Sequence, residues 1–89
     1  MSPDKLVYMA NQIGKFFVSQ GHGKAVAGVA EHIAKFWDPR MRAAIFAHLD
    51  AGGAGLAPCA REAVERLRAA QRNELDGAAQ GPEKLQTSS

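Results

Sequence analysis

Hydrophobic residues recur every three or four positions through most of this chain, and glycine or proline bounds each run of the pattern. This spacing places the hydrophobic side chains on one face of an α-helix. It predicts helices at about 3–19, 24–36 and 39–51, and a fourth that begins near residue 58. No stretch shows the alternation that is typical of a half-buried β-strand. The sequence therefore predicts an all-α fold, a small bundle of about four short helices.

The first two predicted helices each carry a continuous hydrophobic stripe. The stripe of the first consists of Leu6, Met9, Ala10, Ile13, Phe16 and Phe17. The stripe of the second consists of Val26, Val29, Ala30, Ile33, Phe36 and Trp37. Ser2 and Pro3 suit the start of the first helix, and Gly21 follows its end. Because Gly28 and two valines lower the intrinsic propensity of the second helix, we expect tertiary packing to stabilise it.

The third predicted helix has local signals at both ends. Asp38 precedes Pro39, so it is disfavoured in the helical region and ends the second helix. The same two residues suit the N-cap and the first position of the third helix. Gly52 and Gly53 are expected to supply the left-handed residue that ends it, and Leu56 then turns back over the core. The residues of this helix that we expect to be buried are Met41, Ala44, Ile45, Phe46 and Leu49.

The periodic pattern stops after Arg72. Residues 73–89 are rich in Gly, Gln and Ser, which predicts a C-terminal tail that is flexible alone or becomes ordered on a partner. Residues 1–72 contain ten Lys or Arg and six Asp or Glu, which gives a net charge of +4. Residues 73–89 contain one Lys or Arg and three Asp or Glu, which gives a net charge of −2. We therefore divide the chain into a helical domain, 1–72, and a tail, 73–89.

The expected compartment follows from one cysteine and from the absence of long apolar segments. Cys59 is the single cysteine, which excludes an internal disulfide and is typical of a reducing compartment. The first residues lack the uninterrupted apolar run of a signal peptide. The longest apolar stretches are much shorter than the roughly 20 residues that span a membrane. We expect a soluble, cytoplasmic protein that has no membrane partner.

Candidate catalytic and metal-binding residues are few and scattered. His22, His32 and His48 lie in different segments, and none has a second His or Cys at the spacing usual in zinc sites. Cys59, near a helix start, is a candidate nucleophile, but a small packed residue is the simpler interpretation. The glycines within 50–58 follow a helix and lack the GxGxxG spacing of a dinucleotide site. We therefore expect no catalytic, cofactor-binding or metal-binding residue on this chain, and no enzymatic activity of its own.

Two arginines stand where a helix disfavours cations. Arg40 and Arg42 open the third helix, whose first turn carries the positive end of the helix dipole. A local explanation is a cation–π stack of Arg42 on Trp37, at positions that usually hold a hydrophobic staple. Asp38 could also pair with either arginine. A partner protein is the other explanation, because Trp, Phe, Met and Arg are enriched at interface centres.

The tight turn before Pro39 also fits a helix-turn-helix protein that binds nucleic acid. Arg40 and Arg42 would then open the recognition helix. The rest of that helix reads AAIFAHLDA, with almost no groups that contact base edges or phosphates. Nucleic-acid binding is therefore the alternative interpretation, and a protein partner is preferred.

Three segments in combination resemble a known family. They are KLVYMANQIGKFF at 5–17, VAGVAEHIAKFWDPRMRAAIFAHL at 26–49 and GGAGLAP at 52–58. Together they resemble the delta subunit of bacterial NAD-dependent formate dehydrogenases, which are soluble molybdenum or tungsten enzymes. The resemblance extends from about Lys5 to Arg68 and leaves the tail outside.

This resemblance implies a place in a multisubunit complex. In that family the large alpha subunit holds molybdopterin guanine dinucleotide with molybdenum or tungsten, together with iron–sulfur clusters. The beta and gamma subunits carry FMN and further clusters, which lead to NAD. The delta subunit is a small accessory chain without a known cofactor. The resemblance thus implies that this chain binds the alpha subunit directly and supports its assembly, cofactor insertion or stability.

The matching motifs also suggest which residues contact the partner. The expected interface consists of Asn11, Gln12, Phe16, Phe17, Trp37, Arg40, Met41, Arg42 and Phe46. We expect these residues both to shape the fold and to contact the alpha subunit. The family assigns no catalytic residue to this chain.

Overall fold

The computed structural model describes the backbone of residues 2–80 and the side chains of residues 2–71. Its elements are α1 (Pro3–Phe17), a short 3-10 helix η1 (Val18–Gln20), α2 (His22–Phe36), α3 (Pro39–Asp50) and α4 (Pro58–Gln80). The described residues thus form four α-helices and no β-strand, which confirms the predicted all-α fold.

Side-chain caps begin two of the helices where the sequence predicts them. The Ser2 hydroxyl accepts a hydrogen bond from the Lys5 N–H at 3.4 Å, at the start of α1. The Asp38 carboxylate accepts from the Met41 N–H at 2.9 Å, at the start of α3. Both contacts satisfy N–H groups that the first turn of a helix leaves without a partner.

Two glycines end α3, as predicted. Gly52 and Gly53 have φ angles of 123° and 66°, which are unfavourable for residues that carry a Cβ atom. The Gly53 N–H donates to the His48 carbonyl at 2.9 Å, and the Gly52 N–H donates to the Leu49 carbonyl at 3.0 Å. This is the hydrogen-bond pattern of a glycine C-cap. The chain then turns back, and Leu56 is buried against the core.

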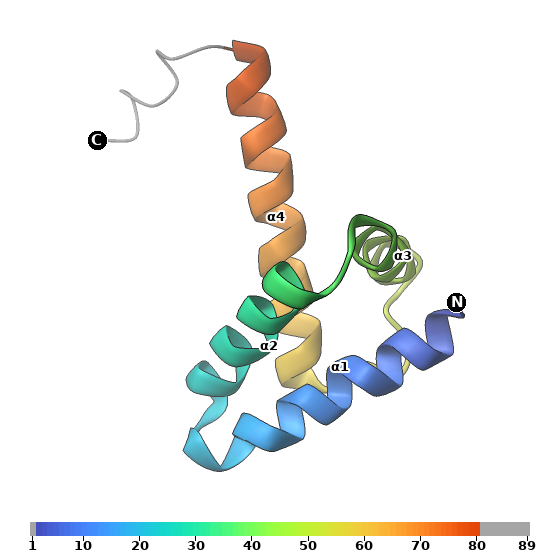
Figure 1. Ribbon diagram of the computed structural model, residues 1–89, viewed down its shortest axis with the longest axis vertical. Helices are drawn as coiled ribbons and strands as arrows, with labels where there is room; N and C mark the ends of the chain where they lie inside the picture. Colours follow the sequence, from blue (N-terminus) through green and yellow to red (C-terminus); the bar gives the residue numbers. More distant parts are fainter. Residues whose placement is uncertain (1, 81–89) are drawn as a thin grey trace.

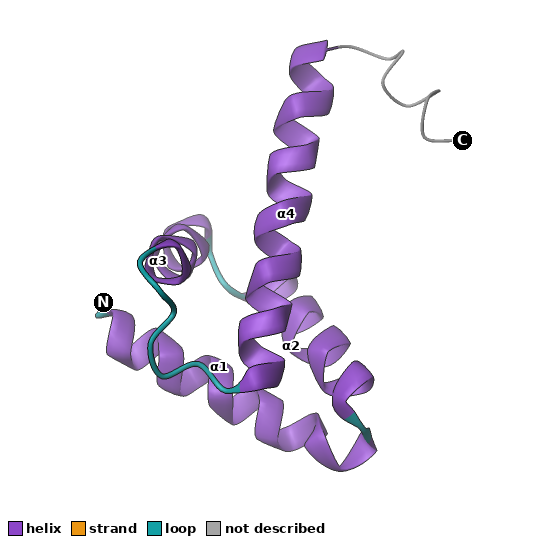
Figure 2. Ribbon diagram, turned by 180° about the vertical axis from the view of Figure 1, so that it is seen from behind, coloured by secondary structure: helices purple, strands orange, loops and turns teal. Residues whose placement is uncertain are grey.

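The helices meet at the centre of the molecule. α2 packs against the first half of α4, and α1 lies across both (Figure 1). α3 is seen end-on beside α4 in the same view, so it runs across α4 rather than along it. From behind, the loop between α3 and α4 passes over α1 before α4 begins (Figure 2). The second half of α4 extends away from the other helices.

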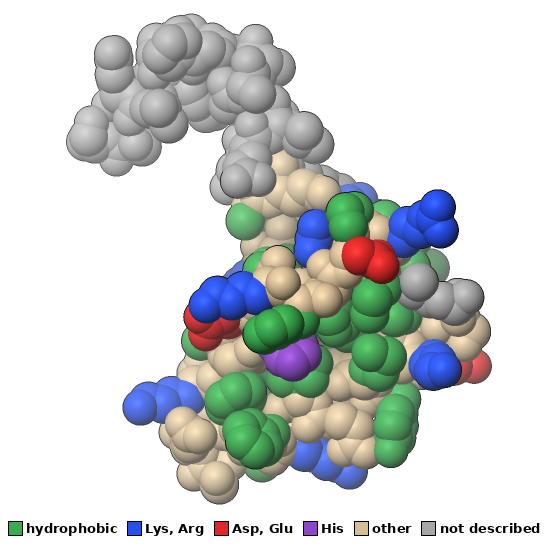
Figure 3. Space-filling view, in the orientation of Figure 1, with side chains coloured by type: hydrophobic (Ala, Val, Ile, Leu, Met, Phe, Trp, Pro, Cys, Tyr) green, Lys and Arg blue, Asp and Glu red, His purple; other side chains and the backbone are tan. Residues whose placement is uncertain are grey.

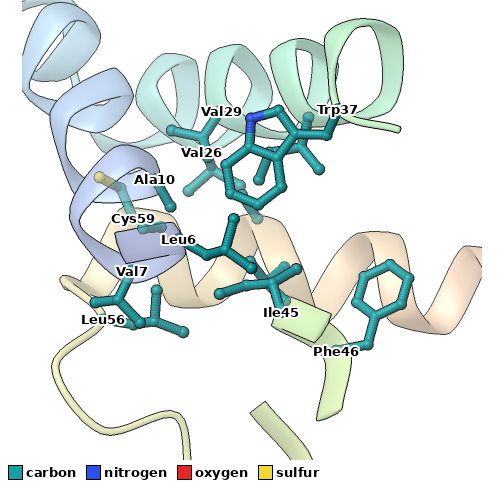
Figure 4. Close-up of a cluster of buried hydrophobic side chains, with 14 of the residues drawn as sticks. Leu6, Val7, Ala10, Val26, Val29, Trp37, Ile45, Phe46, Leu56 and Cys59 are labelled. Carbon is teal, nitrogen blue, oxygen red and sulfur yellow. The ribbon is translucent and has the colours of Figure 1, made fainter. Parts of the chain in front are cut away.

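The core contains side chains from all four helices. Its fully buried members include Leu6 of α1, Ile33 of α2, Ile45 of α3 and Val64 of α4. The Trp37 indole, 3% exposed, is turned toward this cluster from the end of α2 (Figure 4). Full burial of such side chains stabilises the fold by about 1.5–3 kcal/mol each. The core therefore holds the four helices in one unit.

Two phenylalanines of the predicted stripes lie outside the core. Phe16 and Phe36 are 75% and 71% exposed, whereas Val7, which the stripe omits, is buried. The reason is that α1 contacts α2, α3 and α4 at once. Its buried side therefore lies toward Val7, Ala10 and Gly14, and Phe16 is turned toward solvent.

Two glycines allow helices to approach closely. A Cβ at Gly14 would lie 2.6 Å from the Cys59 Sγ atom, and a Cβ at Gly28 would lie 2.5 Å from the Phe17 ring. Both distances are well below van der Waals contact. Gly14 thus permits contact between α1 and α4, and Gly28 permits contact between α1 and α2.

The fourth helix is longer than the sequence predicts. α4 continues past Arg72 to Gln80, so the first part of the predicted tail is helical. The rest of that tail, residues 81–89, lies outside the described residues. The helix therefore does not end at the boundary between residues 1–72 and 73–89.

Candidate partner-binding surface

The exposed large hydrophobic residues are concentrated in the first part of the chain. Among the described residues they are Tyr8, Phe16, Val18 and Phe36, with exposed fractions between 57% and 75%. All four lie on α1, η1 or α2. Isolated exposed hydrophobic residues are common, but a contiguous group marks an interaction site.

Two pairs of rings lie on α1 and α2, Phe16 with Phe17 and His32 with Phe36, and we term the four residues together the aromatic face. The Phe16 and Phe17 rings meet edge to face with centroids 5.1 Å apart. Phe17 lies against Gly28 of α2, and His32, one turn further along α2, contacts the Phe36 ring at a centroid distance of 4.8 Å. Figure 3 shows hydrophobic side chains gathered over α1 and α2, with a histidine among them. The aromatic face therefore spans both helices.

Trp37 and Phe46 are part of the core rather than of the surface. Both are predicted interface residues, but they are only 3% and 4% exposed. Met41 is partly buried and packs against the same core. The tight turn between α2 and α3 directs the indole inward, so its apolar surface is already covered within this chain. Trp37 and Phe46 therefore shape the fold and offer almost no surface to a partner.

Arg42 donates hydrogen bonds to the backbone at the end of α2. Its guanidinium donates to the Trp37 carbonyl and, at 3.4 Å, to the Ala34 carbonyl. Carbonyls at the end of a helix lack intrahelical partners, and this end attracts cations. Arg42 thus caps α2, in place of the predicted stack on the indole. Arg40 is exposed, and its contact with a partner stays a prediction.

Asn11 and Gln12 have different surroundings. The Asn11 side chain donates to the Gly55 carbonyl and accepts from the Ala57 N–H, both at 2.9 Å. It therefore ties the loop before α4 to α1. Gln12 is exposed and donates to the Tyr8 hydroxyl at 2.7 Å. Asn11 thus serves the fold, whereas Gln12 lies on the surface near Phe16.

A groove of about 410 Å³ lies between α1 and the start of α4. Its lining consists of Tyr8, Asn11, Gln12, Gly14, Lys15, Val18, His22, Ala57, Pro58 and Cys59. These residues come from α1, η1, the start of α2, the loop before α4 and the start of α4. No local pattern of the sequence predicts this groove, because its lining comes from segments that lie far apart along the chain. The two exposed hydrophobic residues outside the aromatic face, Tyr8 and Val18, both belong to its lining.

A hydrogen-bonded pair joins the start of α2 to α4 beside the groove. His22 Nε2 lies 2.8 Å from Glu62 Oε1. This hydrogen bond lowers the pKa of the Glu62 carboxyl from its ordinary value, and the charges of His22 and Arg66 lower it further. Glu62 faces His22 and does not belong to the lining of the groove.

Groups able to hold a metal ion do not gather in the described part of the chain. No three His, Cys, Asp or Glu side chains there lie close enough together. No helix within the described residues has both the length and the apolar character needed to cross a membrane. Within the described residues, the aromatic face and the groove are the surfaces that present exposed large hydrophobic side chains.

Comparison with known proteins adds one finding. A family model, FdsD, described as the NADH-dependent formate dehydrogenase delta subunit, matches residues 5–64. This segment contains every residue of the aromatic face and every lining residue of the groove. Searches of curated proteins and of solved structures found no significant match.

Proposed function

Because the chain belongs to the NADH-dependent formate dehydrogenase delta subunit family, we propose that it is a non-catalytic accessory subunit of a formate dehydrogenase complex. It binds the large molybdopterin-containing alpha subunit directly and supports its assembly, cofactor insertion or stability. The beta and gamma subunits belong to the same complex. The molybdenum or tungsten cofactor, the iron–sulfur clusters, FMN and the NAD site lie on those other subunits.

The observation that carries this proposal is the exposure of Phe16 and Phe36 within the aromatic face. Each ring is more than two-thirds exposed although the chain has a well-buried core. Phenylalanine is among the residue types that are enriched at protein interfaces. A partner that covers the aromatic face would remove this apolar area from water, which is favourable.

The aromatic face is also preformed. Phe17 packs against Gly28, and α1 and α2 are held together by the shared core. Binding to a preformed surface costs less conformational entropy than ordering a flexible one. This rigidity suits a subunit that stabilises a larger neighbour.

The exposed side of α3 disfavours nucleic-acid binding. Its exposed residues are Pro39, Arg40, Ala43, Ala47 and Asp50. Arg42 is engaged by carbonyls of α2, so Arg40 is the cation that this surface would offer to a phosphate. Specific recognition needs several phosphate and base contacts. A protein partner is therefore the better-supported function.

The test is recovery of the alpha subunit by a tagged chain that is co-expressed with the alpha, beta and gamma subunits. We expect the double variant Phe16→Ser/Phe36→Ser to recover the alpha subunit more than about tenfold less well, because each lost aromatic anchor costs at least about 1 kcal/mol. Formate-dependent NADH production in the eluate should fall in parallel. Circular dichroism should show unchanged helicity, because neither ring belongs to the core.

The matched control is Ala43→Ser/Ala47→Ser, which changes two exposed positions on α3. This variant should recover the alpha subunit as well as the unchanged chain does. Equal recovery by the aromatic variant would contradict a role for the aromatic face. Failure of the unchanged chain to recover the alpha subunit would contradict the proposed function itself.

A further inference from the structure

The groove between α1 and α4 has the character of a site for a side chain of another protein. Its most buried lining residues are Gly14 and Cys59, and Tyr8 and Val18 present apolar surface beside them. Its volume of about 410 Å³ lies at the small end of the range for ligand pockets, roughly 300–1,000 Å³. A groove of this size suits one or two large side chains better than a bulky cofactor.

The charge of the groove has one sign. Lys15 and His22 are the ionisable basic residues of its lining, and the lining contains no Asp or Glu. His22 is already paired with Glu62, which faces it from outside the lining. Within residues 2–71, no carboxylate forms an ion pair with Lys15. The Lys15 ammonium group is therefore available for a carboxylate supplied by another molecule.

The groove also continues the aromatic face. Gln12, which belongs to its lining, lies one helical turn before Phe16, and Lys15 directly precedes Phe16. A molecule that covers Phe16 therefore comes within reach of the groove without a second docking step.

We propose that the groove receives a large apolar side chain of the alpha subunit, next to an acidic residue that pairs with Lys15. This inference rests on the proposed function and adds the chemistry of the partner's contact. The apolar side chain covers Tyr8 and Val18. The acidic residue fixes the orientation of the alpha subunit on the groove, because opposite charges at an interface orient the partner.

A second copy of this chain fits the groove poorly. A symmetric dimer places the same surface of both copies together. Lys15 of one copy would then approach Lys15 of the other, beside grooves whose linings have no carboxylate. Like charges opposed in this way disfavour the contact.

Cys59 provides a direct reporter, because it is the only cysteine of the chain and lines the groove. We would measure the rate of its alkylation by iodoacetamide in the isolated chain and in the purified complex. We expect alkylation in the complex to be slower by at least about tenfold, because the inserted side chain covers the sulfur. Binding also stabilises the fold, which by itself slows alkylation of a buried thiol.

The control for that effect is Ala63→Cys in a Cys59→Ser chain. Ala63 is fully buried in α4 and does not line the groove, so a thiol there reacts only when the helix opens. The complex should slow the alkylation of Cys59 by a larger factor than it slows the alkylation of the cysteine introduced at position 63. Equal protection at the two positions would overturn the proposal.

The acidic neighbour is tested by Lys15→Glu, with Lys5→Glu as the matched control. Both lysines are exposed on α1, but only Lys15 lines the groove. We expect Lys15→Glu to weaken the complex by about fivefold and to reduce its salt dependence, whereas Lys5→Glu leaves both unchanged. Equal effects of the two substitutions would overturn the charge pairing.

The outcomes separate this inference from the function on which it rests. A complex in which Cys59 reacts as fast as in the isolated chain overturns the groove contact and leaves the proposed function standing. Absence of any complex with the unchanged chain contradicts both. Protection of Cys59 in the isolated chain at high concentration, together with a dimeric mass, would assign the groove to a second copy and overturn the proposal.

Discussion

Gly28 shows how the role of a single residue depends on its neighbours. In an isolated helix, glycine is less favourable than alanine by about 0.8–1.0 kcal/mol. In this protein, however, a Cβ at Gly28 would lie between 2.5 and 2.8 Å from three atoms of the Phe17 ring. The residue that weakens α2 locally is therefore the one that allows α1 to pack against it.

We expect Gly28→Ala to lower the free energy of unfolding by about 1–2 kcal/mol, because displacement of the Phe17 ring outweighs the gain in helix propensity. Urea denaturation followed by circular dichroism measures this change. Gly23→Ala is the control. Gly23 lies in the same helix, and a Cβ at this position would have no atom within 4 Å. It should be neutral or stabilise the protein by up to about 1 kcal/mol. Equal stabilisation by both substitutions would mean that the Phe17 ring moves aside without cost.

At the scale of elements, the junction between α2 and α3 is held by reciprocal caps. Asp38 accepts from the Met41 N–H at the start of α3, and Arg42 donates to the carbonyls of Ala34 and Trp37 at the end of α2. Arg42 therefore lies in the first turn of α3 and stabilises the C-terminal end of α2. This contact explains Arg42, whereas Arg40 has no such role among the described residues.

We expect Asp38→Ala to lower the free energy of unfolding by about 0.5–2 kcal/mol, because the Met41 N–H loses its acceptor. Asp38→Asn should retain most of the stability, since an asparagine side chain also caps a helix. Chemical denaturation of the three proteins at neutral pH compares them directly. If alanine and asparagine gave the same loss, the charge of Asp38 rather than its hydrogen bond would be the stabilising feature.

At the scale of the whole molecule, the described core packs against the first part of α4. Among the side chains of residues 2–71, Val64 is the last fully buried one, and Leu67 is the last one that packs against the core. Arg68 adds an ion pair with Asp50 and lies over the Phe46 ring, 5.6 Å from its centroid. Beyond Gln71, α4 extends away from the other helices (Figure 1).

We expect deletion of residues 72–89 to change the free energy of unfolding by no more than about 0.5 kcal/mol, the usual limit for changes outside a core. Deletion of residues 67–89 should destabilise the protein by at least about 2 kcal/mol, because it removes the packing of Leu67 and both contacts of Arg68. Thermal unfolding of the two truncated chains measures the difference. A large loss from the shorter deletion would show that the end of α4 contributes to the core fold.

The sequence by itself determined the four helices, most of their boundaries and the family. These features depend on neighbours along the chain: Ser2 and Asp38 as caps, Gly52 and Gly53 as a stop, and a hydrophobic period of three to four residues. The end of α4 could not be predicted in the same way. Residues 73–80 are helical without the periodic hydrophobic stripe on which the prediction relied.

Only the tertiary structure decided which aromatic residues are buried and where the groove lies. Trp37 and Phe36 are adjacent in the same predicted stripe, yet the first is in the core and the second is exposed. Periodicity gives the face of a helix, whereas burial depends on which other helices cover that face. The groove joins Tyr8 to Cys59 across more than half of the chain, and only packing of α1 against α4 brings them together.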